Sequence, residues 1–144
     1  MVSSRPPEGE TERVAALDRY GVLDTPPEEP FDDLALLAAQ AFRLPIALIG
    51  FVDVSRVWYK ARIGLELTEL PREGAFCNQV ILDRCLLVIP DALADERFRR
   101  NPLVVSDPRI RFFAGAPLVS PEGHAVGTIC VMDRTPHEPT PEER

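Results

Sequence analysis

Residues 112–133, FFAGAPLVSPEGHAVGTICVMD, set the architecture that the other segments have to complete. The segment predicts two apolar, β-rich strands, 112–119 and 126–132, joined by a turn at Pro121-Glu122-Gly123. Both faces of the second strand are largely apolar: one carries Val126, Thr128, Cys130 and Met132, the other Gly127, Ile129 and Val131. Because a strand without a polar face has to be covered on both sides, the hairpin belongs inside a sheet enclosed by two layers.

Two segments near the start predict helices. Residues 11–20 form a short one, with Val14, Ala16 and Leu17 on its apolar side and Gly21 as its C-cap. Thr25-Pro-Pro-Glu has the form of a capping box, but Pro30 follows it, so we expect one turn at 26–29 and the main helix at 30–42. The apolar stripe of the main helix would consist of Phe31, Leu34, Leu37, Ala38 and Ala41.

The middle of the chain predicts the remaining strands and a covering segment. Residues 46–53 are apolar on both faces and indicate a central strand, with 57–63 as its hairpin neighbour. A short helix at 76–83 and a brief strand at 86–89 follow. The long, proline-punctuated segment 91–108 is typical of a loop that walls or closes a binding site.

Composition narrows the class of protein. The length of 144 residues fits one domain, and a net charge of −7 argues against nucleic-acid partners, which need a basic face. No apolar run approaches the ~20 residues that span a bilayer, and the polar start has no signal peptide, so we expect a cytoplasmic protein without membrane contact. Three cysteines without a Cys-x-x-Cys pair, and two distant histidines, indicate neither a disulfide framework nor a metal site.

The two ends differ from the middle. Residues 1–10 are rich in Ser, Pro and Glu and predict a disordered tail. Residues 135–144 predict a linker, in which Thr140-Pro-Glu-Glu repeats the capping-box pattern and announces a helix beyond Arg144. We therefore expect the domain itself at 11–134 and an output domain after it.

The order of the motifs resembles that of a GAF domain, an α/β sensory module of bacterial signalling proteins. The resemblance spans nearly the whole chain and rests on ERVAALDRYGVLDTPPEEPFDDLALLAAQAF (12–42), PIALIGFVD (45–53), VWYKARIGL (57–65), PREGAFCNQVI (71–81), VIPDALADERF (88–98), NPLVVSDPRIRFFAGAPL (101–118) and HAVGTICVMDR (124–134). It is closest to GAF domains that precede histidine kinases, diguanylate cyclases or further sensory modules.

The resemblance implies a mixed α/β (α+β) fold. Its central antiparallel sheet would have five to six strands, with helices that often mediate dimerisation on one face, and a lid helix and loops over a ligand pocket on the other. Two departures bear on the ligand. Asn78 and Gln79 follow Cys77, where members of this subgroup often carry a histidine two residues after the cysteine. The asparagine-lysine-phenylalanine signature of cyclic-nucleotide-binding members is also absent, which disfavours cyclic GMP and cyclic AMP.

Six residues are candidates to bind a ligand: Trp58, Phe76, Cys77, Asp91, Arg111 and Phe113. Phe76-Cys77 begins the lid helix, where a thiol can have a lowered pKa, or can serve as a small buried apolar group. Asp91 either leaves a strand end toward the pocket or fixes a turn. Arg111 belongs to an arginine-rich lid that either attracts an anion or is a solvated surface. Trp58 and Phe113 either stack on a flat ligand or fill the core.

Three functions remain open at this point. The leading one is a non-catalytic sensory module that binds a small ligand or senses redox state and signals to the output domain. The second is a GAF-fold enzyme similar to the free methionine sulfoxide reductases, which needs two thiols within reach; of the three cysteines we expect only Cys77 in the lid, and Cys130 inside the sheet. The third is a ligand-free module that dimerises through the acidic N-terminal region and the apolar side of 12–20. The sequence identifies no cofactor.

Overall fold

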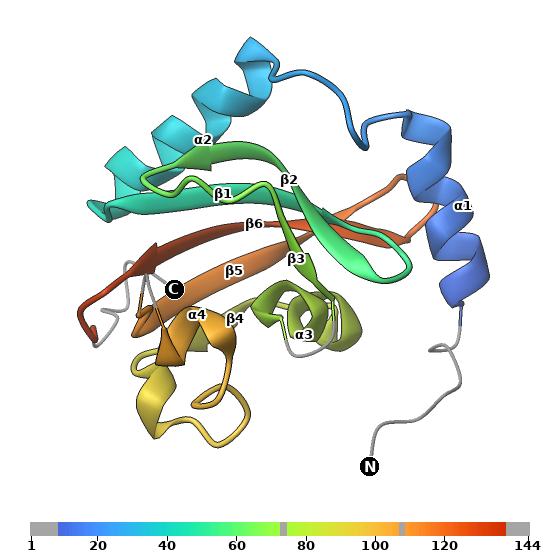
Figure 1. Ribbon diagram of the computed structural model, residues 1–144. Helices are drawn as coiled ribbons and strands as arrows, with labels where there is room; N and C mark the ends of the chain where they lie inside the picture. Colours follow the sequence, from blue (N-terminus) through green and yellow to red (C-terminus); the bar gives the residue numbers. More distant parts are fainter. Residues whose placement is uncertain (1–8, 73–74, 107–108, 138–144) are drawn as a thin grey trace.

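The computed structural model describes residues 9–72, 75–106 and 109–137, and these form one six-stranded antiparallel sheet with helices on both faces (Figure 1). The strands are β1 (Ile46–Val52), β2 (Arg56–Ile63), β3 (Glu69–Pro71), β4 (Leu87–Ile89), β5 (Phe112–Val119) and β6 (Ala125–Asp133). Their order is β3-β2-β1-β6-β5-β4, so the predicted hairpin and the predicted central strand meet in the middle of the sheet. The expected α/β fold is confirmed.

The helices form the outer layers. The N-terminal helices α1 (Glu10–Tyr20) and α2 (Glu29–Phe42) cover one face, where α1 lies against β6 and α2 lies over β1, β2 and β6 (Figure 1). The opposite face is covered by α3 (Phe76–Asp83) and by the segment with the short helices η1 (Ala92–Ala94) and α4 (Pro102–Val105). Each face has its own apolar cluster, and β6 contributes to both. The predicted bounds of the short helix at 76–83 are confirmed.

The expected alternation along β6 is wrong at one residue. Leu118 pairs with Gly127 and Val119 pairs with Ala125, so Val126 is an extra residue in a β-bulge. The bulge turns Val126 toward the α2 face, where it joins Val131 in the apolar cluster, while Cys130 faces α3. A strict period of two cannot anticipate this shift.

The predicted apolar stripe of α2 is also wrong in part. Ala35 and Ala39 are the residues of this helix that the sheet buries, with Phe31 and Ala38 partly buried beside them. Leu34 and Leu37 instead keep 44% and 61% of their surface exposed. Small residues let the helix axis approach the sheet closely, and the larger leucines consequently face away from it.

The expected turn at 26–29 does not form; α2 begins at Glu29, with Pro30 in its first turn, where no backbone N–H is needed. Thr25 does not cap a helix, because its hydroxyl donates to the Val22 carbonyl and accepts from Lys60 Nζ at 2.6 Å. The fully buried Lys60 ammonium also binds the Pro26 carbonyl and the Glu28 carboxylate, each at 2.6 Å. Lys60 thereby fixes the α1–α2 connection to β2.

A buried group of charges, Glu10, Arg13 and Arg72, fastens α1 to the sheet. Glu10 was expected in a disordered tail but is the first residue of α1, and its carboxylate accepts four hydrogen bonds from the two arginines, at 2.5–3.3 Å. Arg13 also donates to the carbonyls of Val52 at 2.6 Å and Ala125 at 3.4 Å. Residues 1–8, and the capping-box motif at 140–143, lie outside the described residues.

Because α1 packs on its own sheet, its apolar side is not available to a second copy. Ala16 and Leu17 are buried in the cluster that also contains Val126 and Val131. The predicted dimer contact through the apolar side of 12–20 is therefore wrong. Exposed apolar surface lies on α2 instead, at Leu34, Leu36 and Leu37.

Candidate functional site

Beneath the lid, aromatic side chains from three elements meet. The Phe76 ring of α3 stacks on Phe113 of β5, with centroids 4.7 Å apart, and contacts Phe98 of the 90–111 segment at 4.8 Å. All three rings are buried. Because Leu103, Val104 and Ile110 are buried in the same cluster, the segment turns its apolar side chains inward and packs as part of the core.

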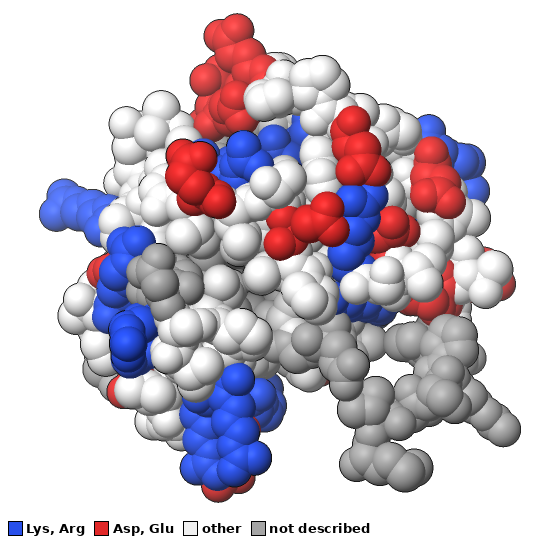
Figure 2. Space-filling view, in the orientation of Figure 1, with Lys and Arg blue, Asp and Glu red and all other residues white. Residues whose placement is uncertain are grey.

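The two predicted polar ligand residues of this segment hold its backbone. Asp91 accepts a hydrogen bond from the Leu93 amide at 3.1 Å and thereby caps η1, as the turn interpretation predicts. Arg111 donates to the carbonyls of Val104 at 3.0 Å and Ile110 at 3.2 Å. Arginines 97, 99 and 100 are exposed, and Figure 2 shows Lys and Arg side chains gathered at the lower edge, where this segment lies in Figure 1.

Trp58 lies on the other face of the sheet. Its partner across the β1–β2 pair is Phe51, which belongs to the apolar cluster beneath α1 and α2, and paired residues project to the same side. The structure therefore brings together Phe76, Cys77 and Phe113, places Asp91 and Arg111 in the covering segment, and keeps Trp58 apart. Ligand binding by the six residues stays a prediction.

The sequence does not predict a group of polar side chains that lies in the core between α3 and the sheet. Cys77, in the first turn of α3, accepts a hydrogen bond from the Thr128 hydroxyl of β6 at 3.0 Å. The Cys130 thiol and the Tyr59 side chain are buried in the same cluster as Cys77. Thr128 was the available signal, since it is the one hydroxyl residue within an otherwise apolar strand.

The surroundings make the two buried thiols unequal. The neighbouring Cys130 thiol, helped by the Thr128 and Tyr59 hydroxyls, lowers the pKa of Cys77 although burial opposes it. The neighbouring Cys77 sulfur, together with burial, raises the pKa of Cys130 well above its usual range. Burial and the nearby Cys77 sulfur likewise raise the pKa of Tyr59. Cys130 lies inside the sheet, as expected, and α3 lies directly on its strand, β6.

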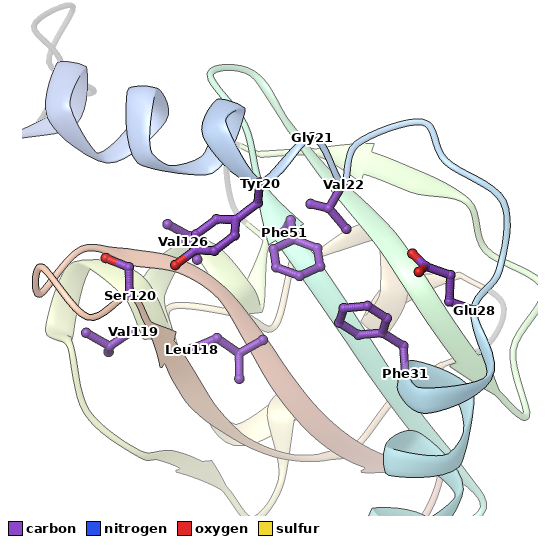
Figure 3. Close-up of a pocket in the computed structure, with 10 residues that line it drawn as sticks. All are labelled: Tyr20, Gly21, Val22, Glu28, Phe31, Phe51, Leu118, Val119, Ser120 and Val126. Atoms are coloured by element: carbon purple, nitrogen blue, oxygen red, sulfur yellow. The ribbon is translucent and has the colours of Figure 1, made fainter.

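A cleft of about 400 Å³ opens on the α1–α2 face (Figure 3). It lies between the end of α1, the start of α2 and the turn between β5 and β6, and the close-up shows the rings of Phe31, Phe51 and Tyr20 directed toward one space. Its walls are mostly apolar, with polar groups at the rim. The lining residues are Tyr20, Gly21, Val22, Glu28, Phe31, Phe51, Leu118, Val119, Ser120 and Val126.

Several elements that lie far apart in the sequence set the geometry of the cleft. Phe31 of α2 meets Phe51 of β1 edge to face, with centroids 6.2 Å apart. Glu28 stands at the rim, where its carboxylate is paired with the buried Lys60 ammonium. The bulge at Val126 turns a further apolar side chain into the wall. Such a cleft has the size and lining that small-molecule sites share.

Within the described residues, no group of three or more His, Cys, Asp or Glu side chains is arranged to hold a metal ion. In the same part of the chain, no helix is both long and apolar enough to cross a membrane.

Comparisons with known proteins agree with the architecture. The model of the GAF domain family matches residues 11–144. A cyclic di-GMP phosphodiesterase of Pseudomonas aeruginosa is 43% identical over 136 residues, which are 94% of this chain and 23% of the phosphodiesterase. The chain thus spans about a quarter of the length of that relative.

Solved structures share the fold at low identity. The GAF domain of a phosphoenolpyruvate-protein phosphotransferase from Coxiella burnetii superposes with a TM-score of 0.66 at 15% identity, covering 94% of this chain and 83% of that one. The free methionine-R-sulfoxide reductase of Neisseria meningitidis superposes with a TM-score of 0.63 at 17% identity, covering 97% and 84%.

Proposed function

This chain belongs to the GAF domain family, and we propose that it is a non-catalytic regulatory module that binds a small ligand and controls a downstream output domain. The observation that carries the proposal is the cleft of about 400 Å³ beside the N-terminal helix. A guest there would touch both α1 and the sheet, so its binding would change how the two fit together. The predicted domain boundary at residue 134 is part of the proposal.

The lining indicates the chemical class of the ligand. Three aromatic rings and four aliphatic side chains suit a flat or compact apolar body, and the Tyr20 and Ser120 hydroxyls at the rim suit one polar substituent. The Glu28 carboxylate is already paired with Lys60, so it adds little net charge to the rim. We therefore propose a neutral, mainly apolar molecule rather than a nucleotide.

Regulation requires that the ligand bind two arrangements with different affinity. The start of α1 is held by the buried charges around Glu10, whereas its end at Tyr20 and Gly21 borders the cleft. A ligand would thus displace one end of α1 while the other stays fixed. Val126, which lines the cleft, belongs to β6, and this strand runs from the cleft to Asp133. It therefore connects the ligand site with the C-terminal end of the domain.

The relative from Pseudomonas aeruginosa suggests the kind of output. We propose that the full protein carries, after this module, a domain that turns over cyclic di-GMP, in the cytoplasm. Measuring the intact mass of the protein isolated from its host tests for the additional domain. Cyclic di-GMP turnover by the full protein, with and without this module, tests the control; equal rates under all conditions would contradict a regulatory role.

The ligand is tested by native mass spectrometry of the chain purified from its host. We expect a retained small molecule in the unaltered chain and in Val105→Trp, and its loss in Val119→Trp, which fills the rim of the cleft. The two valines are matched, because they keep 52% and 50% of their surface exposed. If the unaltered chain has only the mass of the protein, or if Val119→Trp still retains the molecule, the proposed site is wrong.

An enzyme similar to free methionine sulfoxide reductases is the second candidate. The burial of Cys77 and Cys130 in one cluster favours it, since that chemistry needs an attacking and a resolving thiol. Thiol titration after treatment with methionine sulfoxide decides the question. Stoichiometric loss of two thiols, with methionine formed in equal amount, would establish the enzyme and overturn the non-catalytic proposal.

We also propose a homodimer through the exposed leucines of α2, Leu34, Leu36 and Leu37. Light scattering after size-exclusion chromatography measures the mass directly. A dimer that becomes a monomer in Leu37→Glu supports this surface, whereas a monomeric unaltered chain refutes it.

A further inference from the structure

The thiol group under α3 has a feature that core packing does not require. A buried cysteine normally serves as a small apolar side chain, yet the Cys77 sulfur accepts a hydrogen bond from the Thr128 hydroxyl at 3.0 Å, and Tyr59 and Cys130 are buried in the same cluster. Sulfur in a neutral thiol is a weak acceptor, so a hydroxyl donor directed at it favours the thiolate. The position of Cys77 in the first turn of α3 acts in the same direction.

The second thiol is placed to respond to any change at the first. Thr128 and Cys130 are two residues apart on β6, so they project to the same face, and Cys77 is hydrogen-bonded to Thr128 on that face. Both cysteines are 2% exposed. The third cysteine, Cys85, is exposed and lies beyond the end of α3, so the chain contains its own reference thiol.

We propose that Cys77 and Cys130 form a redox-sensitive dithiol, which a small hydroperoxide converts into a disulfide that joins α3 to β6. This inference concerns the face opposite the cleft and does not rest on the proposed ligand.

The chemistry is a two-electron oxidation. The Cys77 sulfur attacks one peroxide oxygen, the O–O bond breaks, and the departing oxygen leaves as water or an alcohol with the thiol proton. The sulfenic acid so formed is attacked by the Cys130 sulfur; the S–O bond breaks and a second water leaves with the Cys130 proton. The net change is the loss of two thiol hydrogens and the reduction of one hydroperoxide.

Burial makes the pair selective for small oxidants. A bulky disulfide reagent cannot approach sulfurs under α3, whereas a hydroperoxide of a few atoms can reach them through local opening of this short helix. Cys85 should show the opposite preference, because bulky reagents reach it freely and it has no partner thiol. After oxidation, Tyr59 and Thr128 lose their strong acceptor, and α3 is covalently attached to β6.

The test uses Cys85→Ser, in which the exposed thiol cannot interfere. The folded protein is treated with hydrogen peroxide, alkylated in denaturant and weighed. We expect a mass decrease of about 2 Da and no alkylation, both reversed by dithiothreitol, and a peptide that links Cys77 to Cys130. Two alkylated thiols after a treatment that fully oxidises glutathione would overturn the proposal, as would a disulfide between two protein molecules.

Single changes in the same background identify the roles. With Cys130 also changed to Ser, dimedone should trap a sulfenic acid on Cys77; with Cys77 changed to Ser, Cys130 should stay reduced. Thr128→Val keeps the shape but removes one donor, and we expect roughly fivefold slower oxidation. Circular dichroism confirms folding of each variant. Unchanged oxidation in both Thr128→Val and Tyr59→Phe would contradict activation by these hydroxyls.

The choice of oxidant distinguishes the redox-sensitive dithiol from the methionine sulfoxide reductase considered above. Disulfide formation with hydrogen peroxide, but not with methionine sulfoxide, supports a redox switch. Formation with methionine sulfoxide at a comparable rate assigns the thiols to a reductase and overturns the switch.

Discussion

Replacing Glu10 by Gln should destabilise the domain strongly, because it removes the one negative charge from a buried site that holds two guanidinium groups. The carboxylate is 2.6 Å from Arg13 Nη2 and 2.5 Å from Arg72 Nη1, and its side chain is only 9% exposed. Glutamine keeps the shape and one acceptor oxygen, but it leaves Arg13 and Arg72 facing each other without compensation.

The magnitude follows from this geometry. Removing one partner of a buried ion pair costs about 3–5 kcal/mol, and the remaining amide oxygen together with the carbonyls that Arg13 and Arg72 also bind reduces the loss to about 2–4 kcal/mol. Urea unfolding followed by circular dichroism measures it, as a fall in the midpoint of about 1–2 M. The matched control is Glu12→Gln, an exposed change in the same helix, which should stay within about 0.5 kcal/mol.

The pH dependence supplies an independent check. Burial opposes ionisation of Glu10, but the hydrogen bonds and charges of Arg13 and Arg72 prevail and lower its pKa in the folded state. The stabilisation is therefore complete above the pKa of the unfolded chain, about 4.3, and is lost as the pH falls through the lower folded pKa. The difference between the unaltered chain and Glu10→Gln should be constant from pH 8 to 5 and shrink below that range. Equal stability of Glu10→Gln and Glu12→Gln at pH 7 would refute the reasoning.

Three further substitutions test the packing, each by urea unfolding. Leu17→Ala should cost about 2–5 kcal/mol, because Leu17 is fully buried between α1 and the sheet, whereas Leu93→Ala, at 48% exposure, should change stability by less than about 0.5 kcal/mol; similar losses for the two variants would contradict the burial of Leu17. Gly127→Ala should cost at least about 1–3 kcal/mol, since its Cβ would lie 2.3 Å from the Gly50 carbonyl oxygen; a neutral result would contradict that close approach. Lys60→Met should cost about 1–3 kcal/mol, because the Pro26 carbonyl loses its donor, and faster proteolysis between α1 and α2 should accompany it.

Local patterns were sufficient for most of the fold. The strands of the two hairpins and the helix at 76–83 follow from apolar runs that end at turn residues, which are properties of neighbouring residues. The stripe of α2 was mispredicted because periodicity does not distinguish Ala35, which the sheet needs for close approach, from Leu34, which it excludes. Val126 was mispredicted because a bulge interrupts the alternation.

The candidate sites were harder to predict, because each joins residues that are distant in the chain. The buried cluster beneath α3 unites Cys77, Cys130 and Tyr59 from α3, β6 and β2, and only the placement of α3 on the sheet reveals it. The cleft lies beside the connection between α1 and α2, which Lys60 of β2 binds through Thr25 and Pro26. No spacing rule encodes either arrangement.

The central position of the last strand affects how the domain is made. β1, complete by Val52, pairs with β2 but gains its second neighbour only when residues 127–132 exist, so the middle of the sheet cannot close before that point of synthesis. Until then one edge of an apolar strand is unpaired, and such species are prone to aggregate. A ribosome stalled before the codon for Thr128 would therefore hold a chain with an incomplete sheet, whereas emergence of residues 127–132 from the exit tunnel should allow both halves to assemble together.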